Sequence, residues 1–336
     1  MRVLGICGGN GVILYPFKKY LIGNIENRSI FRTKDNIQWN LNFNVPILNH
    51  NHIISSALKF KRGTDIIIGA PDCGHSSVLS YSRAKKLGNP KENKSLHLFI
   101  ESIKFYLPKI FLFENLPNLF KTFGEENFDK AFPNYRLIKH LGSVSQFGNS
   151  QKSRKRLVVI GIRNDLSSKI DKYFKLSAKE VKLKTSGILN KGLEYPNAEL
   201  CHIREDDHEV IAIYGGKKLS VGKIKRIWNK RLKHSRRWSI PNSKMRTAPG
   251  VYRNFNRDFP MTVRKQNRQF NENGEMMSPR ELARIQGIPD NFKIWYNPDN
   301  KKHCINKGRV SVTKGPPMEI GYWFKKCLIK SQKLWN

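Results

Sequence analysis

Short, uninterrupted apolar runs separated by polar segments characterise the first half of the chain. One run, Ile66-Ile67-Ile68, lies between Asp65 and Ala70, and another extends from Ile110 to Phe113. Runs that are apolar at every position are typical of strands buried on both faces of a parallel sheet. The pattern predicts further strands that begin near Val3, Tyr20 and Leu157, the first two joined by a helix-like stretch.

The pattern changes about halfway along the chain. Residues 1 to about 165 alternate strand-like and helix-like segments, which is typical of a doubly wound, mostly parallel α/β sheet. From about 166 to 276 the chain is irregular and basic. We therefore expect an α/β domain followed by a second, smaller domain.

Two reactive side chains follow neighbouring buried runs. Cys73 ends Gly69-Ala70-Pro71-Asp72-Cys73, directly after the first run, and Glu114 opens Glu114-Asn115-Leu116 after the second. The carboxyl edge of an open α/β sheet is where such folds bind ligands. The sequence thus predicts a thiol and a carboxyl group together at this edge.

A thiol beside a carboxylic acid suits attack on an electron-poor heterocycle. The thiolate adds to a ring carbon while the acid protonates a ring nitrogen and absorbs the developing charge. Cytosine is such a ring: addition of sulfur at C6 with protonation of N3 makes C5 nucleophilic enough to attack a sulfonium-bound methyl group. The C5 proton then leaves and the thiol is expelled.

Charge indicates the kind of partner. The 336 residues contain 62 Lys+Arg against 26 Asp+Glu, a formal net charge of +36. Such an excess implies a polyanionic partner and salt-dependent binding, although charge alone would equally suit RNA or a membrane surface. No apolar run approaches the roughly 20 residues that span a bilayer, and no signal peptide is apparent. We expect a soluble, intracellular protein without a membrane partner.

The cysteines indicate neither a metal site nor a disulfide framework. The chain has five, at positions 7, 73, 201, 304 and 327, and none forms a C-x-x-C pair. Closely spaced pairs are the usual mark of structural zinc. Reduced thiols and no metal are therefore expected.

Around Cys73 and Glu114 the chain resembles the cytosine-5 DNA methyltransferases. The nucleophile motif of this family is Pro-Cys after a glycine, and its acid lies in Glu-Asn-Val. The segment from Met277 to Asp290 is similar to the family's Arg-Glu-x-Ala-Arg-x-Gln-Gly-x-Pro-Asp motif, and Gln151 to Arg156 is similar to its Gln-x-Arg-x-Arg strand. The motifs occur in the family's order. The resemblance implies catalytic roles for Cys73, Glu114, Arg154 and Arg156, the two arginines organising the catalytic loop and contacting the target cytosine.

The chain departs from the family pattern beside the nucleophile. Asp72 and Gly74 stand where the family has proline and glutamine. An adjacent carboxylate raises the pKa of a thiol and lowers its thiolate fraction unless cationic groups offset it. Two residues separate Gln151 from Arg154, whereas the family has one residue between its glutamine and its first arginine. Either Gln151 or Lys152 therefore occupies the family's glutamine position.

The amino terminus resembles the family's cofactor motif. Cys7-Gly8-Gly9-Asn10-Gly11 matches Phe-x-Gly-x-Gly without the aromatic residue, and Glu26 ends the next predicted strand. Glycines permit close backbone approach, and an acidic residue at that place accepts hydrogen bonds from ribose hydroxyls. The resemblance implies S-adenosylmethionine as the cofactor. The implied cofactor-binding residues are Cys7, Gly9, Gly11, Glu26, Pro71 and Lys314.

The resemblance also assigns the remaining parts of the chain. Residues 166–276 match the position of a target-recognition domain for double-stranded DNA, and residues 277–336 return to the catalytic domain, 1–165. The segment from Gly74 to Lys94 matches a loop that closes over the minor groove once the base is flipped. The DNA-binding candidates are Arg83, Lys225, Arg226, Arg236 and Arg237. We expect a monomer in the cytoplasm of a bacterial or phage-infected cell.

The final motif leaves the methyl donor open. The family has Gly-Asn-x-Val-Pro-Pro, whereas this chain has Val312-Thr313-Lys314-Gly315-Pro316-Pro317, so Thr313 or Lys314 takes the place of asparagine. Lys314 either points to solvent or a DNA phosphate, or enters the donor pocket. In the pocket it would pair with the carboxylate of carboxy-S-adenosylmethionine, and the product would be 5-carboxymethylcytosine.

Other interpretations remain open. Cys73 alone would usually be a small buried hydrophobe, Glu114-Asn115 would cap a following helix, and Arg280, Glu281 and Arg284 would form a solvated helix face. The family also has relatives that modify tRNA, and a degenerate DNA-binding homologue would retain the basic surface. A cysteine-histidine hydrolase built on Cys73 and His75 is remote, because their spacing establishes no nucleophile-base geometry.

Overall fold

The computed structural model describes most of the first half of the chain and shorter parts of the second. The described residues are 1–26, 39–49, 60, 63–72, 93–149, 151, 154–176, 212–214, 217–219, 252–253, 268–269, 279–289, 291–294, 312–313 and 315–335. By contacts they divide into two compact units. Unit 1 comprises Met1–Gly148, Arg154–Glu180 and Gly315–Asn336, and unit 2 comprises Asn149–Ser153 and Val181–Lys314.

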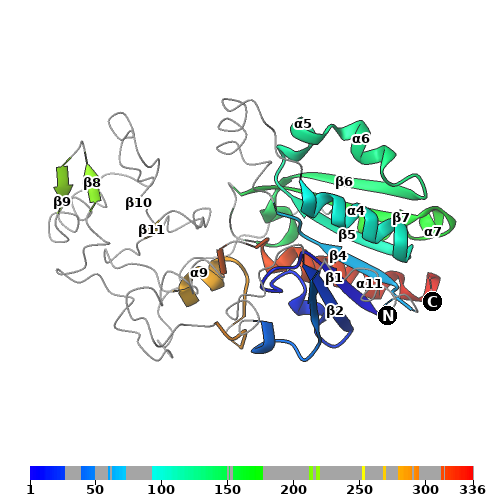
Figure 1. The fold of residues 1–336 in the computed structure, drawn as a ribbon, viewed down its shortest axis with the longest axis horizontal. Coiled ribbons are helices and arrows are strands. Elements are labelled where there is room, and N and C mark those ends of the chain that lie inside the picture. The colour runs from blue at the N-terminus through cyan, green and yellow to red at the C-terminus, as the bar shows by residue number, and fades with distance from the viewer. Residues whose placement is uncertain are drawn as a thin grey trace. The chain divides into compact units, whose positions relative to one another are not determined.

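A seven-stranded sheet in the order β3-β2-β1-β4-β5-β7-β6 forms the centre of unit 1 (Figure 1). Its strands are β1 (Val3–Ile6), β2 (Leu21–Glu26), β3 (Ile47–Asn49), β4 (Ile66–Gly69), β5 (Ile110–Asn115), β6 (Tyr135–Ser143) and β7 (Lys155–Arg163). All pairs from β3 to β5 are parallel, whereas β7 runs antiparallel to both β5 and β6. The predicted doubly wound, mostly parallel α/β fold is confirmed.

Both faces of this sheet are covered. Alternate strand residues contribute to two separate apolar clusters, because successive side chains of a strand point to opposite faces. In β4, Ile66 and Ile68 pack with Phe324 and Leu328 of the carboxyl-terminal helix, whereas Ile67 packs on the opposite side. The predicted strands were apolar at every position for this reason.

Helices flank the sheet and in one place differ from the expectation. They are α4 (Lys94–Tyr106), α5 (Leu119–Phe123), α6 (Glu125–Lys130), α7 (Asn164–Ile170) and α11 (Met318–Ser331), with 3-10 helices η1 (Tyr15–Phe17), η3 (Val144–Phe147), η4 (Asp171–Phe174) and η9 (Gln332–Leu334). The helix-like stretch between β1 and β2 contains only η1, in which Pro16 restricts the backbone. Lys325 of α11 donates to the Pro16 carbonyl at 2.7 Å and so ties the carboxyl-terminal helix to the amino-terminal segment.

Unit 2 contains two small sheets and a short helix in its described part. β8 (Ala212–Tyr214) pairs antiparallel with β9 (Lys217–Leu219), β10 (Tyr252–Arg253) pairs with β11 (Arg268–Gln269), and α9 is Pro279–Ile285. The target-recognition domain and the domain boundaries stay predictions. Among the described helices of both units, none is long and apolar enough to cross a membrane.

Candidate active site

The carboxyl ends of β4 and β5 lie next to each other, as predicted. Gly69 pairs with Phe113, so the polar residues that follow each strand leave the sheet at the same edge. Asn115 joins the two ends: its side-chain Nδ2 donates to the Pro71 carbonyl at 3.1 Å, and its Oδ1 accepts from the amide of Leu116 at 2.8 Å. The segment that leads to position 73 is therefore held against β5.

The alternative role of Glu114-Asn115 as a helix cap is wrong. The next helix, α5, begins only at Leu119, and the residue at its N-cap is Asn118. Both Glu114 and Asn115 belong to β5 and are buried. A buried strand position leaves the carboxyl group of Glu114 available for an interaction across the sheet.

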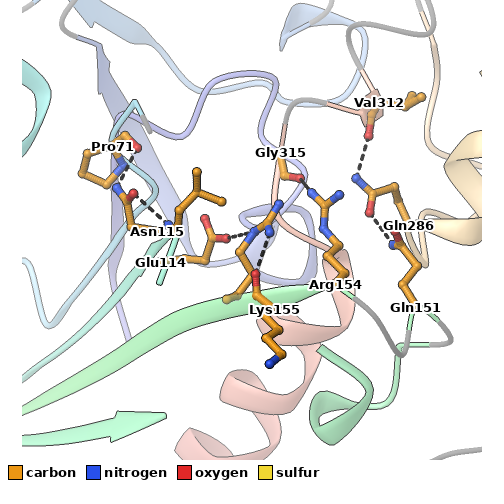
Figure 2. A network of polar contacts seen from close by, with 11 residues as sticks. Pro71, Glu114, Asn115, Gln151, Arg154, Lys155, Gln286, Val312 and Gly315 are labelled. Atoms are coloured by element: carbon orange, nitrogen blue, oxygen red, sulfur yellow. Dashed lines mark hydrogen bonds and ion pairs between the residues drawn. The ribbon is translucent and has the colours of Figure 1, made fainter. Parts of the chain in front are cut away.

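Arg156 provides that interaction. Register pairs Asn115 with Leu157, which brings the preceding residue, Arg156, to the end of β5. Its Nε lies 2.8 Å from Oε1 of Glu114, whose side chain is almost completely buried (Figure 2). Burial raises the pKa of Glu114, while the charges of Arg156 and Arg154 and the hydrogen bond from Arg156 lower it, and burial prevails. The site thus holds a carboxyl group that retains its proton above the usual pH range.

Arg154 lies on the same strand edge but has a different partner. Its side chain is 3% exposed, and Nη2 donates to the carbonyl of Gly315 at 3.0 Å (Figure 2). Gly315 precedes Pro316 and the N-cap of α11. Arg154 therefore fixes the chain at the point where the last motif enters the helix.

The predicted cofactor motif forms a tight turn after β1. Cys7, Gly9 and Gly11 all have positive φ angles, of 53°, 57° and 78°. A Cβ added at Gly9 would meet nothing within 4 Å, whereas one at Gly11 would lie 2.3 Å from the ring of Phe43. Only the first of these glycines leaves space beside the turn; Gly11 is required by packing.

Glu26 at the end of β2 reaches back to this turn. Its Oε1 accepts the amide of Gly9 at 2.5 Å and Nδ2 of Asn24 at 2.8 Å. A carboxylate and a glycine turn that leaves open space therefore lie together at the same edge of the sheet as Glu114.

Comparisons with known proteins agree with this geometry. The family model for C-5 cytosine-specific DNA methylases matches residues 25–307. The chain belongs to this family. Type II methyltransferase M.FnuDI of Fusobacterium nucleatum is 24% identical over 96% of this chain and 92% of that protein.

Solved structures share the fold. A putative DNA modification methyltransferase encoded within an E. coli prophage superposes with a TM-score of 0.64 at 17% identity, covering 99% of both chains. Methyltransferase EhMeth of Entamoeba histolytica gives a TM-score of 0.63 at 12% identity, covering 99% of this chain and 98% of that one. The protein is a DNA (cytosine-5)-methyltransferase with the α/β fold of these enzymes.

Membership of the C-5 cytosine-specific DNA methylases implies S-adenosylmethionine as the methyl donor. The glycine turn suits such a group, because the open space at Gly9 and the carboxylate of Glu26 lie side by side. Cys7 is buried, and its Sγ contacts the Ser95 carbonyl at 4.0 Å. Pro71 is buried as well. Their roles, like those of the other cofactor residues, stay predictions.

Gln151 belongs to a buried amide network within unit 2. Its Nε2 donates to Oε1 of Gln286 at 2.7 Å, and Nε2 of Gln286 donates to the Val312 carbonyl at 3.2 Å (Figure 2). Asn149 and Gln151 also both donate to the Ile285 carbonyl at the end of α9. Lys152, the alternative for the family's glutamine position, lies outside the described residues, so the choice between the two stays a prediction.

Several predicted site residues also lie outside the described part of the chain. They are Cys73, Arg83, Lys225, Arg226, Arg236, Arg237 and Lys314. Thr313, the other residue in the place of the family's asparagine, is buried. In the described ranges no group of three or more His, Cys, Asp or Glu could hold a metal ion.

Asn24 and Asn115 were not singled out from the sequence as site residues. Each is a buried amide on a strand that otherwise consists mainly of apolar residues and glycine. That isolation inside an apolar strand is the signal that would have indicated them, because a buried amide requires partners.

Proposed function

We propose that the protein methylates C5 of a flipped cytosine in duplex DNA at a short specific sequence, through a covalent adduct with Cys73. The observation that carries the proposal is the buried Glu114 carboxyl paired with Arg156 at the edge where the Cys73 segment leaves β4. The charge of +36 supports a polyanionic substrate. The type II methyltransferase relative supports a role in restriction-modification.

In this mechanism the thiolate of Cys73 adds to C6 of the cytosine while Glu114 delivers its proton to N3. S-adenosylmethionine, when bound, would supply the sulfonium-bound methyl group that C5 takes up, and it would leave as S-adenosylhomocysteine. Loss of the C5 proton then restores the ring's double bond and expels the thiolate, and N3 returns its proton. Asn115 holds the Pro71 carbonyl and so orients the segment that bears the nucleophile.

The raised pKa of Glu114 suits its role as the acid. A carboxyl group with its usual pKa is almost entirely ionised at neutral pH and has no proton to donate. Burial increases the protonated fraction, and Arg156 stabilises the carboxylate that remains after transfer. The pair is thus suited to a proton that leaves and returns in each cycle.

The proposal assigns DNA contacts to the second half of the chain. Residues 166–276 would read base edges in the major groove, with Lys225, Arg226, Arg236 and Arg237 holding phosphates. Arg83 would belong to a loop that closes over the minor groove. Exchanging residues 170–258 for the matching segment of a relative should change the methylated sequence and leave the reaction intact. An unchanged site in bisulfite sequencing would place recognition elsewhere.

Incubation of duplex DNA with labelled S-adenosylmethionine, followed by nucleoside mass spectrometry and bisulfite sequencing, tests the proposal. The expected product is 5-methylcytosine at one sequence. Cys73→Ser should abolish transfer while DNA affinity persists, and a duplex with 5-fluorocytosine at the target should trap the wild type covalently, because fluorine cannot leave as the C5 proton does. Full activity of Cys73→Ser would overturn the mechanism.

The same assay separates the alternatives. Transfer to RNA but not to duplex DNA would identify an RNA cytosine-5 methyltransferase. DNA binding without transfer to any substrate, with the donor bound, would identify a degenerate DNA-binding homologue. Retention of the buried Glu114 in an ion pair with Arg156 favours the active enzyme.

A further inference from the structure

We propose that Asn24 is a positioning residue for the methyl donor: it fixes the glycine turn and the carboxylate of Glu26 in one geometry before the donor binds. The inference rests on the proposed function, because it takes the donor to bind at Gly9 and Glu26.

Asn24 contacts both halves of the predicted donor site. It lies on β2 opposite Gly5 of β1 and is fully buried. Its Oδ1 accepts the amide of Gly8 at 3.2 Å, and its Nδ2 donates to Oε1 of Glu26 at 2.8 Å. One side chain therefore connects the turn after β1 with the end of β2.

The glycines of β1 and the turn make room for this side chain. A Cβ at Gly5 would lie 2.5 Å from Oδ1 of Asn24 and 2.6 Å from Cδ1 of Leu14. A Cβ at Gly8 would lie 2.9 Å and 2.5 Å from the same two atoms. Since real Cβ atoms do not approach so closely, a side chain at Gly5 or Gly8 would force Asn24 or Leu14 to shift. Gly9, by contrast, has open space beside it.

Glu26 is held from two sides at one oxygen. Oε1 accepts from Nδ2 of Asn24 and from the amide of Gly9. The carboxylate cannot turn about its last bond without losing both hydrogen bonds. A carboxylate that is already oriented binds ribose hydroxyls at a smaller entropic cost, so Asn24 contributes to donor affinity through Glu26.

The proposed mechanism gives Asn24 no part in the chemical step. The acid that the mechanism uses, Glu114, has its own partner in Arg156. Loss of Asn24 should therefore weaken donor binding without slowing the chemical step at saturation.

The test compares Asn24→Leu, which keeps the approximate shape, with Asn24→Asp, which keeps the acceptor for Gly8 but places a carboxylate against Glu26. Isothermal titration with S-adenosylhomocysteine should show roughly 10- to 100-fold weaker binding for Asn24→Leu, the usual effect of a lost hydrogen bond to a charged group. Asn24→Asp should be weaker still. The rate at saturating S-adenosylmethionine should stay within about twofold of wild type.

Asn24→Ser serves as the second variant, because serine is smaller than leucine and keeps a polar group at the turn. It should also weaken donor binding. Ser102→Ala is the matched control: Ser102 is buried on α4, and its hydroxyl donates within that helix to the Leu98 carbonyl. The control should leave affinity for S-adenosylhomocysteine unchanged.

Glu26→Gln distinguishes a failure of the proposed donor site from a failure of the positioning role of Asn24. Unchanged affinity in Glu26→Gln would overturn the donor site itself. Weakened binding in Glu26→Gln together with unchanged binding in Asn24→Leu and Asn24→Ser would overturn only the role of Asn24. A lower saturated rate with unchanged affinity in the Asn24 variants would also contradict positioning of the donor.

Discussion

Glu26 and Glu114 stand at the ends of two strands of the same sheet and differ in what surrounds them. Glu26 is half-buried, and its Oε1 accepts from an amide of the glycine turn and from the side chain of Asn24. Glu114 is buried, and its partner is the guanidinium of Arg156. The same residue type thus occurs once as a fixed acceptor and once as a titratable acid.

The contrast shows how neighbours assign a role to a carboxyl group. Neutral donors orient a carboxylate without requiring it to gain or lose a proton. Burial favours the protonated form, and a nearby arginine stabilises the anion left by proton transfer. Burial raises the pKa of Glu114, and Arg156 opposes the rise.

The largest expected effect is on the rate of the chemical step, which should depend on Glu114 and not on Glu26. Glu114→Gln should slow single-turnover methylation by about 100- to 10,000-fold, because an amide cannot donate the proton that stabilises the adduct. Binding of S-adenosylhomocysteine and of DNA should persist. Glu26→Gln should show the reverse pattern, weaker donor binding with a saturated rate close to wild type.

Rapid-quench assays and calorimetry on both variants distinguish these outcomes. Equal rates for Glu114→Gln and wild type would remove the acid from the mechanism. A large fall in the saturated rate of Glu26→Gln would show that the two carboxyl groups do not have separate roles.

A second, smaller effect concerns the pH dependence of the chemical step. The acid must be protonated, so the rate should fall as pH rises through the pKa of Glu114. Arg156→Met removes the largest influence that lowers this pKa, so the midpoint of the fall should move to higher pH. The rate at neutral pH should drop by about 10- to 100-fold, the scale of a lost charged hydrogen bond in the transition state.

The pH-rate profile of Arg156→Met, measured in single turnovers, checks the direction of the shift. Glu26→Gln is the control, since the proposed mechanism gives Glu26 no proton to transfer, and its profile should match that of the wild type. A midpoint that moves to lower pH in Arg156→Met would contradict Glu114 as the titrating acid.

Arg154 should give a third effect, on stability more than on chemistry. Arg154→Met removes a hydrogen bond from a charged group to the partly buried Gly315 carbonyl, which costs about 1–3 kcal/mol of unfolding free energy. Urea denaturation measures the loss. Arg154→Lys keeps the charge near Glu114, so its pH-rate profile should stay in place whereas that of Arg154→Met shifts to higher pH. Equal stability of all three proteins would show that Gly315 needs no such donor.

The buried strands could be predicted because their apolar runs are continuous. β4 and β5 lie between other strands with both faces covered, so Ile66–Ile68 and Ile110–Phe113 are apolar at every position. The edge strand β6 was not predicted, since most of its residues are partly exposed and include Lys139 and His140. Continuous apolar runs thus predicted the central strands of the sheet but not the edge strand β6.

Site residues that belong to a sequence motif could be predicted, whereas contacts that depend on the register between strands could not. Glu114 was identified from the strand end and the family motif together. The pairing with Arg156 depends on β7 running antiparallel beside β5, which places Asn115 opposite Leu157. Asn24 depends on register too, because only its position opposite Gly5 lets one amide reach both Gly8 and Glu26.

The smallest expected effect concerns Lys314, whose neighbour Gly315 is held by Arg154. If Lys314 points to solvent or to a DNA phosphate, Lys314→Asn should change the choice between S-adenosylmethionine and carboxy-S-adenosylmethionine by less than about twofold, since an exposed lysine makes few specific contacts. Competition of the two donors, read as 5-methylcytosine against 5-carboxymethylcytosine by mass spectrometry, measures the ratio. Carboxymethyl transfer by the wild type that disappears in Lys314→Asn would instead place the ammonium group in the donor pocket, where it would pair with the extra carboxylate.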